Sequence, residues 1–186
     1  MEKIKKFCLT HISMDKSGYS RESDISIGEK FPPLELETTK GSLRLPNYFA
    51  NKWFILFSHP KDFTPVCTLE YVQFAKKFSS FNELNCGVVG LSLDSLKSHE
   101  DWIKDLSDKY DVEIPYPIIS DENSSISLKL GILNKKNDIT NRSVIFVDTN
   151  GIIRSILHYP PEISRSVNEI IRVLNELQKC DEKKDM

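Results

Sequence analysis

The residues best suited to chemistry lie within one short stretch of the first half of the chain. It reads Pro60-Lys61-Asp62-Phe63-Thr64-Pro65-Val66-Cys67. Proline is favoured at the first position of a helix, so Pro65 predicts a helix start with Thr64 as the N-cap. Cys67 then falls in the first helical turn, where unpaired amide N–H groups and the positive end of the helix dipole stabilise a thiolate. The pattern therefore indicates a nucleophilic cysteine.

The neighbours of this cysteine favour reaction with a hydroperoxide. Thr64 lies three residues before Cys67, so the hydroxyl and the sulfur can converge on one spot. A hydroperoxide needs one oxygen held while the other is attacked, and Pro60 would cover the reacting atoms without adding a donor. The leaving oxygen gains negative charge, and the rigid donor fork of an arginine suits that charge. Arg142 is the candidate for this role.

Each of these residues also has a plainer interpretation. A single cysteine is often a small buried hydrophobic residue, and Arg142 alone reads as a surface or ion-pair arginine. His59 alone reads as a histidine in a loop or at the edge of the core.

The cysteines of the chain are Cys8, Cys67, Cys86 and Cys180. They lie far apart and form no C-x-x-C motif, so we expect neither a metal site nor a disulfide scaffold.

A buried strand and a helix must position the reactive stretch. Residues 53–57 form a continuous apolar run, as expected for a strand buried on both faces. Apolar residues then recur at helical spacing from Pro65 to about Phe81. The loop between them lies beyond the carboxyl end of a strand, where ligands bind in open α/β sheets. The other predicted elements are a hairpin over 34–45, strands over 87–93 and 118–119, a helix capped by Asp94 or Ser95, a helix over 124–130, a hairpin over 143–158 with an Asn-Gly turn, and a final helix over 166–179.

The order of these elements predicts the fold. Helices alternate with strands, and a hairpin and a helix close the chain. We expect an α/β, thioredoxin-like fold with a mixed central sheet flanked by helices. The length suits one domain, which we place at residues 25–186, after a flexible N-terminal extension of residues 1–24.

Composition and charge argue against several classes of function. The chain has 186 residues, a formal net charge of −2 and 39% hydrophobic residues. No basic stripe interleaves with aromatic residues, so we expect no nucleic-acid partner. The longest apolar stretches are strand-sized and the N-terminus lacks the apolar run of a secretory signal, so we expect no membrane segment and no export. A cytoplasmic protein with free thiols is the expectation.

The motif Pro60-x-x-x-Thr64-x-x-Cys67 resembles the signature of the peroxiredoxins. The wider run from Phe57 to Thr68 resembles the 1-Cys, peroxiredoxin 6-type branch in particular. The likeness covers most of residues 25–180 and includes the segments 90–95, 117–119, 142–148 and 159–160. It implies a peroxidase on a thioredoxin-like fold that needs no metal, haem or flavin.

The resemblance also implies roles for seven residues. Those that would act on the peroxide are Cys67 as the peroxidatic thiol, Thr64 and Arg142 as the groups that bind and polarise it, and Pro60 as the shield of the sulfenic acid. Those that would support them are His59, which matches the active-site histidine of the branch, and Glu70 and Arg165, which match an ionic network around the arginine. Lys52 stands where the mammalian branch member has a lipase-like serine, so no phospholipase activity is carried over.

We therefore expect a thiol-dependent peroxidase that reduces hydrogen peroxide and organic hydroperoxides through a Cys67 sulfenic acid, in antioxidant defence. The Val-Cys-Pro motif of the typical 2-Cys branch does not occur in the sequence. An external thiol such as thioredoxin or glutathione is then the expected reductant. One alternative is a 2-Cys-like cycle with Cys180 as the resolving cysteine, and another is a redox-signalling or holdase protein with low turnover. We also expect the chain to lack the C-terminal arm of the 1-Cys branch, and the expected assembly is a homodimer or a higher homo-oligomer.

Overall fold

A computed structural model describes residues 25–134 and 136–182 of the chain. The extension predicted for residues 1–24, with Cys8, lies outside this part and stays a prediction. The elements are β1 (Leu34–Leu36), β2 (Leu43–Leu45), a 3-10 turn (Asn47–Phe49), β3 (Trp53–Ser58), α1 (Pro65–Lys76), α2 (Phe78–Glu83), β4 (Cys86–Ser92), α3 (Leu96–Tyr110), β5 (Ile118–Ser120), α4 (Ser125–Lys129), β6 (Leu133–Asn134), β7 (Ile139–Thr140), β8 (Arg142–Val147), β9 (Ile153–Tyr159) and α5 (Val167–Glu182).

The central sheet has five strands in the order β5-β4-β3-β8-β9. β3, β4 and β5 run parallel to one another, whereas β8 runs antiparallel to both β3 and β9. β3 is the middle strand, and all six of its residues are buried. The predicted α/β, thioredoxin-like fold with a mixed sheet and flanking helices is therefore confirmed.

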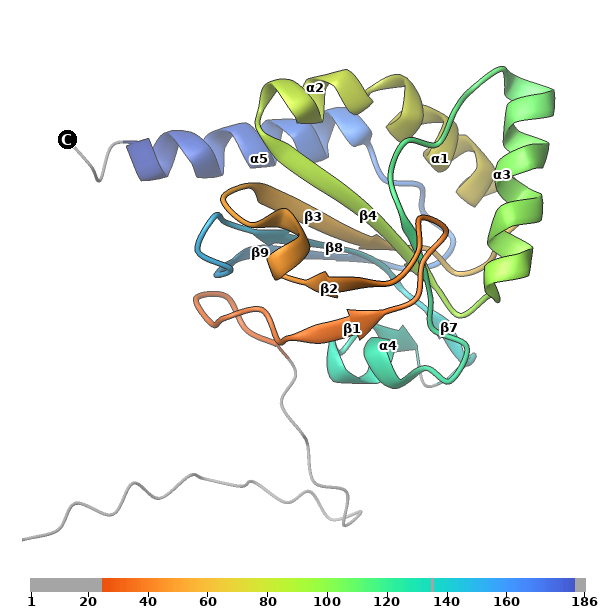
Figure 1. The fold of residues 1–186 in the computed structure, drawn as a ribbon, viewed down its shortest axis with the longest axis horizontal. Coiled ribbons are helices and arrows are strands. Elements are labelled where there is room, and N and C mark those ends of the chain that lie inside the picture. The colour runs from red at the N-terminus through yellow and green to blue at the C-terminus, as the bar shows by residue number, and fades with distance from the viewer. Residues whose placement is uncertain (1–24, 135, 183–186) are drawn as a thin grey trace, which may run out of the picture.

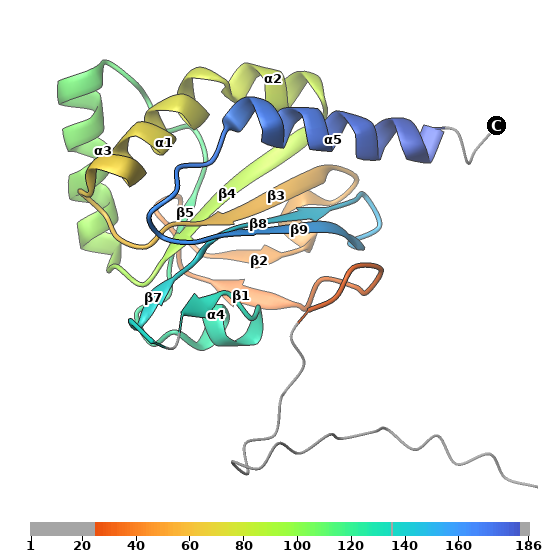
Figure 2. The same ribbon diagram turned by 180° about the vertical axis from the view of Figure 1, so that it is seen from behind.

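Alternation along β3 divides the core into two layers, because successive side chains of a strand point to opposite faces. Trp53, Ile55 and Phe57 pack into the layer that also holds residues of α1, α3 and α5. Phe54 and Leu56 pack into the other layer, with the β1–β2 hairpin. Figures 1 and 2 show α1, α2 and α5 over one face of the sheet, and the hairpin and α4 on the other.

Several local expectations hold. β1 and β2 pair as an antiparallel hairpin, and β8 and β9 form the hairpin predicted from the Asn-Gly turn. Gly151 in that turn has φ +74°, a conformation that favours glycine. Ser95 caps α3 by accepting the N–H of Ser98 at 3.2 Å. The two hairpins and the helix cap were predictable because each is formed by residues that lie close together in the sequence.

Three features differ from the sequence expectation: one helix break, one short hairpin and the end of the last helix. The helix predicted over 65–81 is interrupted at Lys77, whose backbone is non-helical at φ −103° and ψ 8°. Both halves keep their apolar spacing, and Phe74 stacks on Phe81 across the break at 5.9 Å, so the hydrophobic pattern carries no sign of the interruption. The short β6–β7 hairpin was also missed, because strands of two residues leave no readable alternation.

The final helix continues to Glu182, beyond the predicted end at residue 179. Arg154 of β9 pairs with Asp181, and Gln178 donates to the Leu84 carbonyl at 2.7 Å. These contacts tie the last turns of α5 to the body of the domain. Cys180 is consequently a helical residue, not part of a frayed end.

Candidate active site

The helix start predicted from Pro65 is confirmed, and it places Cys67 in the first turn of α1. β3 ends at Ser58, six loop residues follow, and the sulfur-bearing side chain of Cys67 is fully buried. Thr64 has the extended backbone of an N-cap residue, at φ −82° and ψ 145°. Its hydroxyl makes no cap, however, because it donates to the Lys61 carbonyl at 3.0 Å. The threonine therefore ties the loop onto itself directly before the reactive turn.

Arg142 is the first residue of β8, the strand next to β3, and its side chain contacts Cys67. β8 pairs with β3, with Val144 opposite Phe57, so the first residue of β8 lies just past the carboxyl end of β3. Nη1 of Arg142 is 3.3 Å from the Cys67 sulfur. The same nitrogen donates to Glu70 at 2.6 Å, and Nε donates to the Pro161 carbonyl at 2.7 Å. The guanidinium is thus held in a fixed orientation against the thiol.

Glu70 joins Arg142 to a second buried arginine, Arg165. Oε1 of Glu70 accepts the backbone N–H of Arg165 at 2.6 Å and its Nε at 3.0 Å, and Oε2 accepts its Nη2 at 2.9 Å. Arg165 also donates to the Ser143 carbonyl at 2.8 Å. Burial by itself works to raise the pKa of Glu70, but hydrogen bonds and charge from Arg165, together with the charge of Arg142, hold it below its ordinary value.

The charges of this cluster do not cancel. Two guanidinium groups face one carboxylate, so one positive charge remains uncompensated next to the Cys67 sulfur. An anion at the sulfur is favoured by such a neighbour. Cys67, Arg142, Glu70 and Arg165 were expected together from sequence, and the structure brings all four into contact.

His59 belongs to a second buried network. Its Nε2 is 2.8 Å from Oδ1 of Asp62, and its Nδ1 is 2.9 Å from the hydroxyl of Tyr71. Oδ2 of Asp62 is in turn 2.8 Å from Nδ1 of His99 on α3. Both ring nitrogens of His59 are therefore engaged by these partners, and Tyr71, four residues after Cys67 on α1, joins His59 to that helix.

Three members of this second network were not predicted. Asp62 follows His59 by three residues, a spacing that could have suggested a contact within the loop. Tyr71 and His99 gave no such signal, because they lie on α1 and α3 and only the fold brings them to His59 and Asp62. His99 lies one turn before Trp102 on the buried side of α3.

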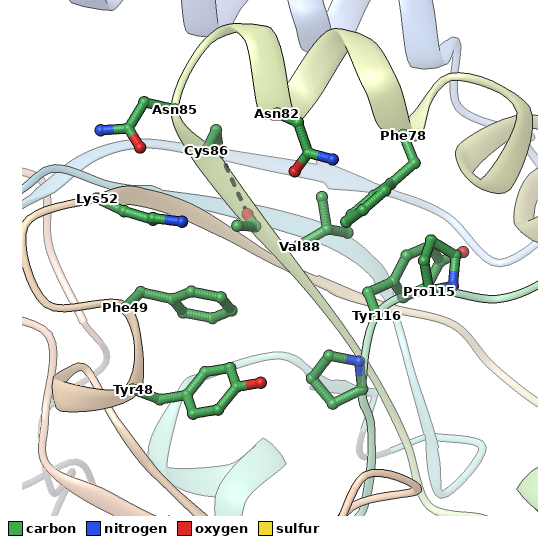
Figure 3. A pocket seen from close by; sticks show the side chains of 12 residues that line it. Tyr48, Phe49, Lys52, Phe78, Asn82, Asn85, Cys86, Val88, Pro115 and Tyr116 are labelled. Carbon is green, nitrogen blue, oxygen red and sulfur yellow. Dashed lines mark hydrogen bonds between the residues drawn. The ribbon is translucent and has the colours of Figure 1, made fainter.

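Cys86 lies at the far end of the sheet from Cys67. It opens β4 opposite Trp53, the first residue of β3, whereas the Cys67 loop follows the last residue of β3. Burial raises the pKa of the Cys86 thiol well above its ordinary value, and the sulfur donates to the Gly87 carbonyl at 3.3 Å. Figure 3 shows this thiol beside a hollow that Phe49 and Lys52 also line. Cys86 is a core residue in this setting.

Cys180 is exposed and distant from the site within one chain. Arg165 contacts Glu70, and α5 begins two residues later at Val167. Cys180 lies thirteen positions after Val167 on α5, which is a rise of about 20 Å. Figure 2 shows α5 running away from the start of α1 toward the opposite end of the molecule.

The fold and the site together define a class of protein. It is a thiol enzyme with a thioredoxin-like fold, in which an arginine side chain contacts the cysteine sulfur. The sequence profile of the AhpC/TSA family matches residues 27–156. The chain is 49% identical to a peroxiredoxin of Hyperthermus butylicus, over 84% of this chain and 68% of that protein. It is also 49% identical to a peroxiredoxin of Methanococcus vannielii, over 83% of this chain and 73% of the relative.

Solved structures agree with this assignment. A cysteine-to-serine mutant of peroxiredoxin 6 from Arenicola marina superposes with a TM-score of 0.79 at 33% identity, over 83% of this chain and 74% of that one. A yeast mitochondrial 1-Cys peroxiredoxin gives 0.80 at 34% identity, over 85% and 78%. The chain belongs to the AhpC/TSA family and is a peroxiredoxin, a thiol-dependent peroxidase. Across residues 25–134 and 136–182, none of the helices has the length and apolar character needed to cross a membrane.

Proposed function

We propose that the chain reduces hydrogen peroxide and organic hydroperoxides through the thiolate of Cys67, in antioxidant defence. The observation that carries the proposal is the 3.3 Å contact between Nη1 of Arg142 and the Cys67 sulfur, at the first turn of a helix. A fixed cation and the helix N-terminus both favour the thiolate, which is the nucleophilic form.

In the proposed step the thiolate attacks one peroxide oxygen and the O–O bond breaks. The attacked oxygen stays on sulfur as a sulfenic acid, and the other leaves with the bonding electron pair and takes up a proton, giving water or an alcohol. Nε and Nη1 of Arg142 are already occupied by Pro161, Glu70 and Cys67. Within the described residues Nη2 has no hydrogen-bond partner, so its donors are free for the leaving oxygen.

The remaining residues act through position. Thr64 would place its hydroxyl beside the peroxide and Pro60 would shield the sulfenic acid from water. Glu70 and Arg165 hold Arg142 in orientation, because their hydrogen bonds fix the carboxylate to which Arg142 donates. His59 would help to position α1 through its hydrogen bond with the Tyr71 hydroxyl.

The sulfenic acid is proposed to be restored by an external thiol, as in a 1-Cys cycle. A disulfide needs Cα atoms within about 7 Å, whereas Cys180 lies about 20 Å along α5 from Val167, where that helix begins. Glutathione and thioredoxin are the proposed reductants, since the structure of the yeast mitochondrial 1-Cys relative is described in terms of thiol resolution by both systems. Both reductants work in a reducing compartment, and we propose a cytoplasmic location. We also propose that the protein is a homodimer or a higher homo-oligomer.

Peroxide consumption by two variants tests the proposal. Cys67→Ser should consume no hydrogen peroxide. A variant with Cys8→Ser, Cys86→Ala and Cys180→Ser should consume one equivalent without a reductant, and should turn over when glutathione or thioredoxin is supplied with its reductase. Peroxidase activity that persists in Cys67→Ser would rule out the proposed nucleophile.

A further inference from the structure

Two histidines share the carboxylate of Asp62 in the interior of the protein. His59 and His99 each approach a different oxygen of Asp62 at 2.8 Å, and Ser98 donates its hydroxyl to Oδ2 at 2.7 Å. The side chains of both histidines are 0% exposed and that of Asp62 is 1% exposed. A buried carboxylate is costly unless it is fully hydrogen-bonded and its charge is compensated.

Both ring nitrogens of His99 face hydrogen-bond acceptors. Its Nδ1 faces the carboxylate of Asp62, and its Nε2 faces the carbonyl oxygen of Ile119 at 3.2 Å. Both partners are acceptors only, whereas a neutral imidazole carries a single N–H. Both contacts are hydrogen bonds only if both nitrogens of His99 are protonated.

His59 differs from His99 in this respect. Its Nε2 donates to Asp62, but its Nδ1 faces the hydroxyl of Tyr71, which has a proton to give. One N–H therefore satisfies His59. Burial lowers the pKa of His59, which favours this neutral form, and the charge of His99 acts in the same direction.

We propose that His99 is held as an imidazolium paired with the Asp62 carboxylate, and that this buried pair is the anchor that positions the Cys67 turn. The positioning part of this inference rests on the proposed function of Cys67. Burial alone would raise the pKa of Asp62, but hydrogen bonds from His59 and His99 bring it far below its ordinary value, so the carboxylate is charged.

The pair links three elements around the reactive cysteine. Asp62 lies in the loop before α1, and its backbone N–H donates to Asp94 at the start of the α3 region, at 3.0 Å. His99 lies on α3 itself. The other oxygen of Asp62 fixes His59, which accepts the Tyr71 hydroxyl of α1. Tyr71 and Cys67 are four residues apart on α1, so the orientation of His59 bears on the turn that carries the thiol.

Packing around Tyr71 leaves this chain of contacts little freedom. A Cβ atom at Gly90 of β4 would lie 2.3 Å from the Tyr71 hydroxyl oxygen, so the hydroxyl fits only against a glycine. The backbone of His59 is also fixed, because its N–H donates to Leu91 at 2.9 Å and its carbonyl accepts the Thr140 hydroxyl at 2.6 Å. A change at Asp62 is therefore expected to be transmitted to α1.

Nitrogen NMR of the full chain labelled with ¹⁵N-histidine tests the charge on His99. The parent should show both ring nitrogens of His99 protonated at neutral pH, with the signal assigned by its loss in His99→Gln. In Asp62→Asn the new amide can donate to His99 and still accept from His59, so His99 should become neutral. The control is Asp101→Asn, which removes an exposed carboxylate paired with Lys97 on the same helix and should leave His99 charged.

A neutral His99 in the parent would overturn the inference, whatever the variants do. So would a stoichiometric metal ion in the purified protein that is lost in Asp62→Asn, because His59, Asp62 and His99 lie close enough to hold a cation and the charge would then be a metal. Mass spectrometry of the metal content should instead give the same background for the parent and the variant.

Single-turnover kinetics with hydrogen peroxide test the positioning role. Asp62→Asn should lower the second-order rate by about tenfold or more, since small misplacements of reacting groups cost that much. It should also change the pH profile of the rate, whereas Asp101→Asn should match the parent in both. An unchanged rate and profile in Asp62→Asn, with His99 neutral, would overturn the positioning role. A parent without peroxidase activity would refute the proposed function and leave the NMR result as the test of the pair.

Discussion

At the scale of single residues, the site consists of the Cys67 sulfur and the buried charges of Arg142, Glu70 and Arg165. Cys67, Thr64 and Pro65 could be predicted to share a helix start because their signals are local. Arg142 could be proposed from its chemistry, but 75 positions separate it from Cys67 and only strand pairing brings them together. Tyr71 and His99 could not be found, because a buried polar residue on a helix looks like any other core position. The three-residue spacing of His59 and Asp62 suggests a contact within the loop, but it does not show that Asp62 also reaches His99 on α3.

Arg142→Lys tests whether the planar donor fork matters. A lysine keeps the charge but cannot donate to Pro161, Glu70 and a peroxide oxygen in one plane. The second-order rate with hydrogen peroxide should fall by about two orders of magnitude, the usual effect of losing an oxyanion donor. Arg154→Lys, at an ion-paired arginine of β9, is the matched control and should keep the parent rate. Equal rates in Arg142→Lys and the parent would make Arg142 a structural residue.

Glu70→Gln tests the compensation of the two buried guanidinium groups. Removing the carboxylate leaves them facing each other, so the free energy of unfolding should fall by about 3–5 kcal/mol. Denaturant unfolding measures this loss. Glu169→Gln, at an exposed carboxylate paired with Arg172, should change little.

The pH dependence of the same carboxylate follows from its lowered pKa. A group whose pKa is lower when folded contributes stability above its unfolded pKa, near 4.5, and loses that contribution as the pH falls through the folded value. The stability of the parent should therefore decline on acidification below about pH 4.5, and Glu70→Gln should decline less steeply. Parallel declines in the two proteins would contradict this assignment.

At the scale of elements, continuous apolar runs, apolar residues at helical spacing and turn and cap signals were enough to find the main helices and strands. The interruption at Lys77 and the end of α5 were not predictable in this way. The first leaves the apolar spacing intact, and the second depends on Arg154 of β9 reaching Asp181 on α5. The end of a helix that is fixed by contacts with distant residues cannot be located from the sequence of the helix alone.

Arg154→Ala should loosen the last turn of α5. A partly buried ion pair contributes about 1 kcal/mol, so amide hydrogen exchange in residues 178–182 should accelerate by about fivefold. The single-turnover rate of Cys67 should stay at the parent value, because the pair lies at the far end of α5. Unchanged exchange would mean that the Gln178 contact with Leu84 alone holds the helix end.

At the scale of the whole molecule, the sheet keeps its thiols apart. The Cys67 loop follows the carboxyl end of β3, Cys86 opens β4 at the other end, and Cys180 lies near the end of α5. Cys67, the thiol that we propose as reactive, therefore lies against Arg142 and its partners, with no second cysteine of the described residues beside it. This arrangement favours a sulfenic acid that waits for an external thiol.

Oxidation with one equivalent of hydrogen peroxide, followed by sulfenic-acid trapping with dimedone and non-reducing mass spectrometry, tests directly whether Cys67 is the thiol that reacts. We predict the adduct on Cys67, with Cys86 and Cys180 unmodified. A dominant disulfide between Cys67 and Cys180, within or between chains, or an adduct mainly on another cysteine, would contradict it.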